Sequence, residues 1–73
     1  MPKPPHNDEK ILRFIYAVGI YLQLEYDPFY TSMFNRTGYA QSIYDFLGTH
    51  YLAGEPIPNA ARYLVEFMEQ ELL

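Results

Sequence analysis

The sequence contains no cysteine. This absence excludes disulfide scaffolds and every site that is built on a thiolate. Cations are also scarce, because five Lys and Arg stand against nine Asp and Glu, which gives a formal net charge of -4 at pH 7. Affinity for nucleic acids depends on Lys and Arg that neutralise phosphates, so no nucleic-acid partner is expected.

Long hydrophobic runs are missing as well. The longest uncharged run covers residues 14–24, which is well short of the ~20 residues that span a bilayer. Residues 1–6 are rich in proline and lack the apolar stretch of a signal peptide. We therefore expect no membrane partner. We expect the protein to be cytoplasmic or, if it is viral, to lie in an intracellular compartment of the host. Residues 1–6 are predicted to be a flexible tail, and residues 7–73 a single helical domain.

Histidine and glycine are sparse. The two histidines are His6 and His50, and the four glycines stand apart from one another. No zinc-ligand spacing and no phosphate-binding loop is present, so we predict neither a metal site nor a cofactor. His50 is the one residue that we consider for catalysis, because the helical pattern places it on a buried side. A histidine in the last turn of a helix more often donates to free backbone carbonyls, and we predict no enzymatic activity.

Aromatic residues are what the chain has in abundance. Eight Tyr and five Phe contribute to a hydrophobic fraction of 49%, enough to fill a small core. Apolar residues recur at helical spacing between Gly and Pro. The sequence therefore predicts an all-α fold, a small bundle of three main helices with a short fourth, and we expect it to self-associate.

The first helix is predicted to begin at a cap, Asn7 or Asp8, and to continue to about Glu25. The Asp-Pro dipeptide that follows stops this helix. Its aspartate can cap a new turn and its proline suits a first helical position, which predicts a short helix over residues 28–34.

The second long helix is predicted to begin after Thr37, which is a fair cap, and to continue to about Leu52. Gly54 is placed as its C-terminal stop. The last helix is predicted over residues 59–72, with Pro58 in its first turn.

The first helix has two apolar sides. One is an ordinary core face, formed by Ile11, Phe14, Ile15, Val18 and Leu22. The opposite side, which we call the outer flank, carries few charges where a surface helix should be polar. Its residues are Arg13, Tyr16, Ala17, Ile20 and Leu24. Two interpretations stay open: the flank is packed between the other helices, or it is a dimer seam or a groove for another protein.

The other two long helices have one buried side each. In the second, the inward residues are Tyr39, Ala40, Ile43, Phe46, Leu47, His50 and Tyr51, and Gln41, Asp45, Gly48 and Thr49 lie opposite. In the last, the inward residues are Ala60, Ala61, Leu64, Val65, Phe67, Met68 and Leu72, and Glu71 also points to the apolar side. Each of these helices is expected to pack by one face.

Four aromatic residues crowd the connection after the first helix: Tyr26, Phe29, Tyr30 and Phe34. This is more aromatic area than a solvated loop displays, so the segment either folds back on the core or contacts a partner. Gly19 costs ~1 kcal/mol relative to Ala within a helix. It therefore indicates close approach by another helix, from the same chain or from a second copy.

These features favour a non-enzymatic protein–protein interaction module. We expect the module to form a homodimer and to bind a basic protein partner. It would cover a surface of that partner, as a viral or phage inhibitor does. The predicted partner-binding residues are Arg13, Tyr16, Ala17, Ile20, Leu24, Phe29 and Tyr30. The alternative is a small transcriptional regulator that inserts its second or last long helix into DNA, although such a helix should be basic.

Overall fold

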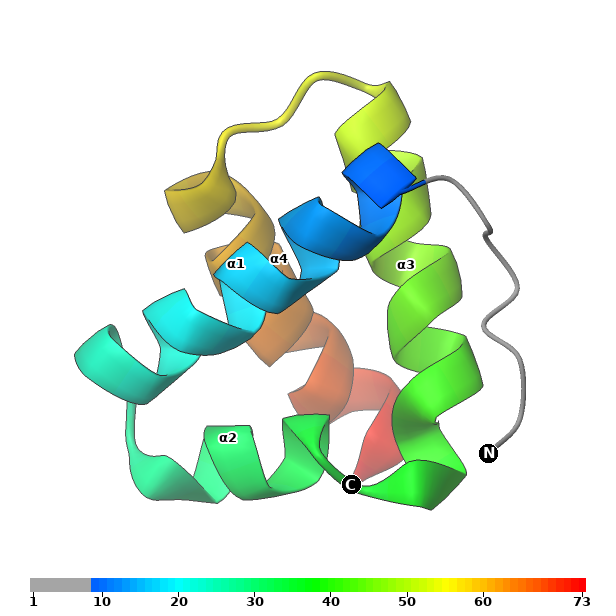
Figure 1. Cartoon of the computed structure of the whole chain (residues 1–73). Coiled ribbons are helices and arrows are strands. Elements are labelled where there is room, and N and C mark those ends of the chain that lie inside the picture. Colours follow the sequence, from blue (N-terminus) through cyan, green and yellow to red (C-terminus); the bar gives the residue numbers. More distant parts are fainter. Residues whose placement is uncertain (1–8) are drawn as a thin grey trace.

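The computed structural model describes residues 9–73, and these residues form an all-α domain with four α-helices (Figure 1). The helices are α1 (Glu9–Glu25), α2 (Pro28–Phe34), α3 (Ala40–Leu52) and α4 (Ile57–Phe67). A 3-10 turn, η1 (Thr37–Tyr39), precedes α3, and a π-helical turn, η2 (Met68–Leu72), continues α4. The predicted all-α bundle with a short additional helix is confirmed.

Two predicted features lie outside the described residues. These are the flexible tail over residues 1–6 and the N-cap at Asn7 or Asp8. Within residues 9–73, no helix has the length and apolar character needed to cross a membrane.

The connection between α1 and α2 follows the sequence prediction. The carboxylate of Asp27 accepts a hydrogen bond from the Phe29 backbone N–H at 2.9 Å, and Pro28 occupies the first turn of α2. Proline costs nothing there because a first-turn N–H has no partner within the helix. This cap allows a helix of seven residues to start directly after α1 ends.

The predicted stop at Gly54 is also confirmed. Gly54 has a φ of +79°, a conformation that glycine adopts without a steric penalty. Its N–H donates to the Tyr51 carbonyl at 3.0 Å, and the Glu55 N–H donates to the His50 carbonyl at 3.1 Å. This pair of bonds is a Schellman motif, and it satisfies carbonyls that the end of α3 leaves free.

Three boundaries differ from the prediction by a few residues. Residues 37–39 form a 3-10 turn, so the α-helical winding of α3 begins at Ala40. The last helix begins at Ile57, two residues early, because Pro58 is accommodated within its first turn. After Phe67 the winding widens to π, and the changed spacing leaves Glu71 exposed rather than on the apolar side.

The core lies where α1 meets the other three helices, which it contacts in turn along its length (Figure 1). It is built from a run of small and medium apolar side chains with partly buried aromatics around them. The buried residues are Ile11, Ile15, Val18, Leu22, Met33, Ile43, Leu47, Ala60, Ala61, Leu64, Val65 and Met68. The predicted core face of α1 is confirmed, with Phe14 half-buried at its edge.

Gly48 is buried, although the helical pattern placed it on the polar side of its helix. On the surface of α3 it stands between Tyr44, one turn before it, and Tyr51, one turn after it, and both rings are half-buried. Leu52 on the same helix is exposed.

Leu22→Ala is expected to lower the free energy of unfolding by about 2–5 kcal/mol, because Leu22 is completely buried and truncation leaves a cavity. Leu52→Ala is the matched control, since Leu52 is 73% exposed, and it should change stability by no more than ~0.5 kcal/mol. Urea unfolding followed by circular dichroism measures both. Equal effects of the two substitutions would contradict the placement of α1.

Candidate interaction surface

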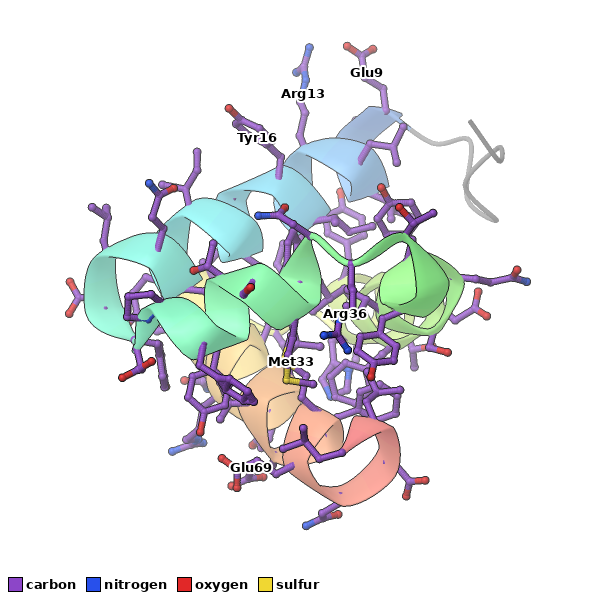
Figure 2. All side chains as sticks on the ribbon, turned by 90° about the horizontal axis from the view of Figure 1, so that it is seen from below. Glu9, Arg13, Tyr16, Met33, Arg36 and Glu69 are labelled. Atoms are coloured by element: carbon purple, nitrogen blue, oxygen red, sulfur yellow. The ribbon has the colours of Figure 1, made fainter. Side chains whose placement is uncertain are left out.

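The outer flank of α1 is exposed in the structure. Tyr16 is 71% exposed and Leu24 75%, and Ile20 between them is 42% exposed. Arg13 is exposed too, while Ala17 is half-buried. Figure 2 shows Arg13 and Tyr16 pointing away from the body of the molecule. The interpretation in which the other helices cover this flank is therefore wrong for Tyr16, Ile20 and Leu24.

Charged residues stand at the two ends of the flank. At the N-terminal end, Arg13 donates to the carboxylate of Glu9 at 2.7 Å, and both side chains are about three-quarters exposed. At the C-terminal end stand the exposed carboxylates of Glu25 and Asp27. The flank is thus an apolar strip with an ion pair at its N-terminal end and acids beyond its C-terminal end.

A hollow of about 140 Å³ borders the strip and opens between α1 and α2. Its α1 side consists of Tyr16, Gly19, Ile20 and Gln23, and its α2 side of Thr31, Phe34 and Asn35. A second hollow, of about 500 Å³, shares Gln23, Thr31 and Asn35 with the first and extends to Pro28 and Ser32. We call this pair of hollows the α1–α2 groove.

Gly19 explains how α2 comes so close to α1. A Cβ at this position would lie 2.8 Å from Cε1 of Phe34, closer than carbon atoms pack. The close approach that Gly19 predicts is therefore confirmed, and the approaching group is a side chain of the same chain. The ring of Phe34 forms one wall of the groove.

The groove also holds a polar atom without a partner. The Oγ1 of Thr31 is buried, and it makes no hydrogen bond to any group in the part of the chain that the structure describes. Buried hydroxyls are almost always paired. The oxygen is enclosed within the wall of the groove, where no group from outside the chain reaches it.

Phe29 and Tyr30 lie on a different surface from the outer flank. Tyr26, Tyr30 and Phe34 are half-buried and pack against the core, so the aromatic connection does fold back on the core. Phe29 remains 46% exposed and lines a separate hollow that Arg36 and Leu73 also border. The predicted partner-binding residues are thus divided between two surfaces.

The hydroxyl of Tyr30 is engaged within the chain. It donates to Oε1 of Glu69 in η2 at 2.7 Å. This hydrogen bond to a carboxylate raises the pKa of the Tyr30 phenol above its ordinary value of 10.0, with smaller contributions from desolvation and from the charges of Glu69 and Asp27. Tyr30 therefore joins α2 to the C-terminal turn.

His50 is positioned as the helical pattern predicts. Its Nδ1 lies 2.9 Å from the Phe46 carbonyl oxygen one turn earlier. The imidazole stands between the rings of Phe46, at 4.2 Å, and Tyr63, at 5.5 Å between centroids. Among residues 9–73, no three His, Asp or Glu side chains are grouped so that they could hold a metal ion.

Sequence reasoning did not find the aromatic column that crosses from α3 to α4. Phe46 stacks on Phe67 at 4.5 Å, and Arg62 lies over the ring of Tyr63 at 5.1 Å. The spacing of four residues within each helix was the available signal. The column also places the cation of α4 against a ring, and α3 contains no Lys or Arg. Nothing here adds support for insertion of either helix into DNA.

Comparisons of the chain with protein-family models, with curated proteins and with solved structures found no match. Its function is therefore inferred from its own surface.

Gly19→Ala tests how α2 is seated on α1. We expect the overlap with Phe34 to cost about 1–3 kcal/mol, which cancels or exceeds the ~1 kcal/mol gained in helix propensity, so the free energy of unfolding stays the same or falls. In a Phe34→Leu background the ring is gone, and the same substitution should raise stability by up to ~1 kcal/mol. Chemical unfolding measures both effects. A destabilisation of the same size in both backgrounds would refute the contact.

The bond between Tyr30 and Glu69 predicts a late tyrosine titration. Because the folded-state pKa of Tyr30 is raised, the stability that this bond contributes is complete below the ordinary pKa and is lost as the pH rises through the folded-state pKa. The difference in ultraviolet absorbance between the wild type and Tyr30→Phe should show a phenol that ionises above pH 10.0. In a Glu69→Ala background the midpoint should return towards the ordinary value, and an unchanged midpoint would exclude Glu69 as the cause.

Proposed function

We propose that this protein is a non-enzymatic protein–protein interaction module that self-associates through the outer flank of α1. The observation that carries the proposal is the exposure of Tyr16, Ile20 and Leu24 in one continuous strip on a single helix. Water-exposed apolar strips of this kind are typical of protein interfaces, and tyrosine is enriched at their centres.

The size of the chain supports the same proposal. A chain of 73 residues buries ~60% of the surface that its unfolded form exposes. α1 is apolar on both sides, and the helices that follow it are enough to bury its inner face. A second protein surface removes the other face from water, and the burial of that face contributes to the free energy of association.

The charge of the module indicates the chemistry of a further partner. The net charge is -4 per chain, and we propose that the acidic surface outside the outer flank meets a basic protein surface. Complementary charge mainly raises the rate of encounter and the specificity of binding. The module would then act by covering the partner's basic surface, as a viral or phage inhibitor does, because it offers both contact area and negative charge.

Leu24→Glu and Leu52→Glu form a matched pair that tests self-association. The two leucines are 75% and 73% exposed, on α1 and α3 respectively. The wild type should show a mass near twice 8.6 kDa at high concentration. Leu24→Glu should reduce it to that of one chain, because a buried carboxylate without a partner opposes association. Leu52→Glu should leave the mass unchanged.

Light scattering gives the mass, and circular dichroism confirms that each variant remains helical. A wild type that stays at the mass of one chain at every concentration would overturn the proposal. So would a folded Leu24→Glu variant with the same mass as the wild type.

A further inference from the structure

We propose that a hollow between α3 and α4 binds an arginine side chain of a basic protein partner. We call it the α3–α4 hollow, and its volume is about 240 Å³. This inference rests on the basic partner proposed above, and it adds the place where that partner is recognised and the side chain that is recognised.

Aromatic rings form one side of the α3–α4 hollow. All of them are half-buried, and they belong to Phe46, His50, Tyr63 and Phe67. The rings of Phe46 and Phe67 are stacked at 4.5 Å, so this side is held in place by the contact between the two helices. Pockets for drug-sized ligands usually measure about 300–1,000 Å³. The α3–α4 hollow is smaller and has the size for one side chain.

The other side of the hollow is polar and acidic. It consists of Glu66, Gln70 and Glu71, which are all exposed. Neither glutamate forms an ion pair with a cation among residues 9–73. Both stand in the last turns before the C-terminal end of the helix, where the negative end of the helix dipole also favours a cation. The charge and the dipole therefore act in the same direction.

The π turn η2 explains why the two glutamates share one hollow. At α-helical winding, side chains five residues apart point about 140° away from each other. Hydrogen bonds in a π turn connect residues five apart, so the widened winding over Met68–Leu72 brings residue 71 round towards residue 66. Like charges on one side of a helix repel each other. A cation in the hollow removes that repulsion, and π turns are frequent at functional sites.

His50 adds a hydrogen-bond acceptor to the same hollow. Its Nδ1 lies 2.9 Å from the Phe46 carbonyl oxygen, and a carbonyl only accepts, so Nδ1 is the nitrogen that donates. In the neutral imidazole Nε2 is then an acceptor. Nε2 has no hydrogen-bond partner within residues 9–73, and it is not enclosed by the protein. A donor that enters the hollow can therefore use it.

The combination of rings and acceptors favours arginine over lysine. A guanidinium is planar, packs against aromatic rings, is weakly hydrated and spreads five donors over a plane. Arg62 already makes such a contact at the neighbouring turn, since its guanidinium lies 5.1 Å from the centre of the Tyr63 ring. An ammonium is a compact and strongly hydrated charge, which gains less from the rings.

The arginine is expected to come from a different protein. Within this chain, Arg13 is paired with Glu9, Arg36 lies over Tyr39 and donates to its hydroxyl, and Arg62 lies over Tyr63. The sequence contains no other arginine. A second copy also carries a net charge of -4, so it is repelled by an acidic site.

Three substitutions with the same change in charge test the hollow. The probe is a blocked peptide of alternating glycine and arginine, and its affinity is measured by calorimetry at physiological salt. Glu66→Gln and Glu71→Gln should each weaken binding by about two- to five-fold, as expected for the loss of one exposed ion pair. Glu25→Gln is the matched control, because Glu25 is exposed on α1, and it should leave the affinity nearly unchanged. Circular dichroism confirms that each variant remains helical.

Two further peptides test the chemistry of the occupant. Replacement of every arginine by citrulline keeps the shape and removes the charge, and this peptide should not bind. Replacement by lysine keeps the charge and removes the planar group, and this peptide should bind more weakly. Nuclear magnetic resonance locates the site, because arginine should shift the ring signals of His50, Tyr63 and Phe67.

The outcomes separate this inference from the proposed function. An arginine peptide that binds all three variants as tightly as the wild type, or a lysine peptide that binds equally well, would overturn the inference and leave a basic partner that is met elsewhere on the surface. Failure of every peptide to bind the wild type would remove the basic partner and this inference together. Self-association is measured separately by light scattering, and neither result changes it.

Discussion

The burial of one face of α1 is the constraint on which the rest of the structure depends. Ile15, Val18 and Leu22 on that face are in the core, and α2, α3 and α4 all contact the helix that carries them. Three helices are enough to enclose one side of a helix of 17 residues. They are too few to enclose the opposite side as well, so the apolar residues there remain in contact with water. The exposed flank is therefore a consequence of how few helices pack against α1.

The elements of the fold could be predicted because their causes are local. The period of the apolar residues in α1 determines its inner and outer sides. The Asp27-Pro28 dipeptide determines where α2 begins, and the conformation of Gly54 determines where α3 ends. Each signal acts within a few residues of chain. Two of the three boundaries that differed lie where a second local form, a 3-10 or a π turn, competes with the α-helix.

The candidate site could be predicted only in part, because its other half depends on tertiary packing. The exposed strip on α1 follows from the helical period alone. The groove beside it depends on the position of Phe34 over Gly19, and two residues 15 positions apart give no periodic signal. For the same reason the sequence predicts that Tyr30 belongs with the partner-binding residues of the flank. In the structure its hydroxyl donates a hydrogen bond to Glu69, 39 residues later.

Tyrosine hydroxyls hold the acidic C-terminal turn in place. Carboxylates near a helix C-terminus oppose the helix dipole, at a cost of a few tenths of a kcal/mol. Glu69 accepts a hydrogen bond from Tyr30 of α2, and the Leu72 carbonyl accepts one from Tyr39 of η1. The C-terminal turn is thereby tied to α2 and η1 through groups that a purely apolar core would lack.

Gly19 links the stability of the fold to the shape of the interaction surface. An alanine there would favour the helix by ~1 kcal/mol but would displace the ring of Phe34. The groove has one wall from each of these helices, so its width is set by the same contact that seats α2. A substitution at Gly19 that displaces Phe34 should thus also change the shape of the α1–α2 groove. Gly19 lowers the stability of the isolated helix. In the folded chain it leaves room for the ring of Phe34, which forms one wall of the groove.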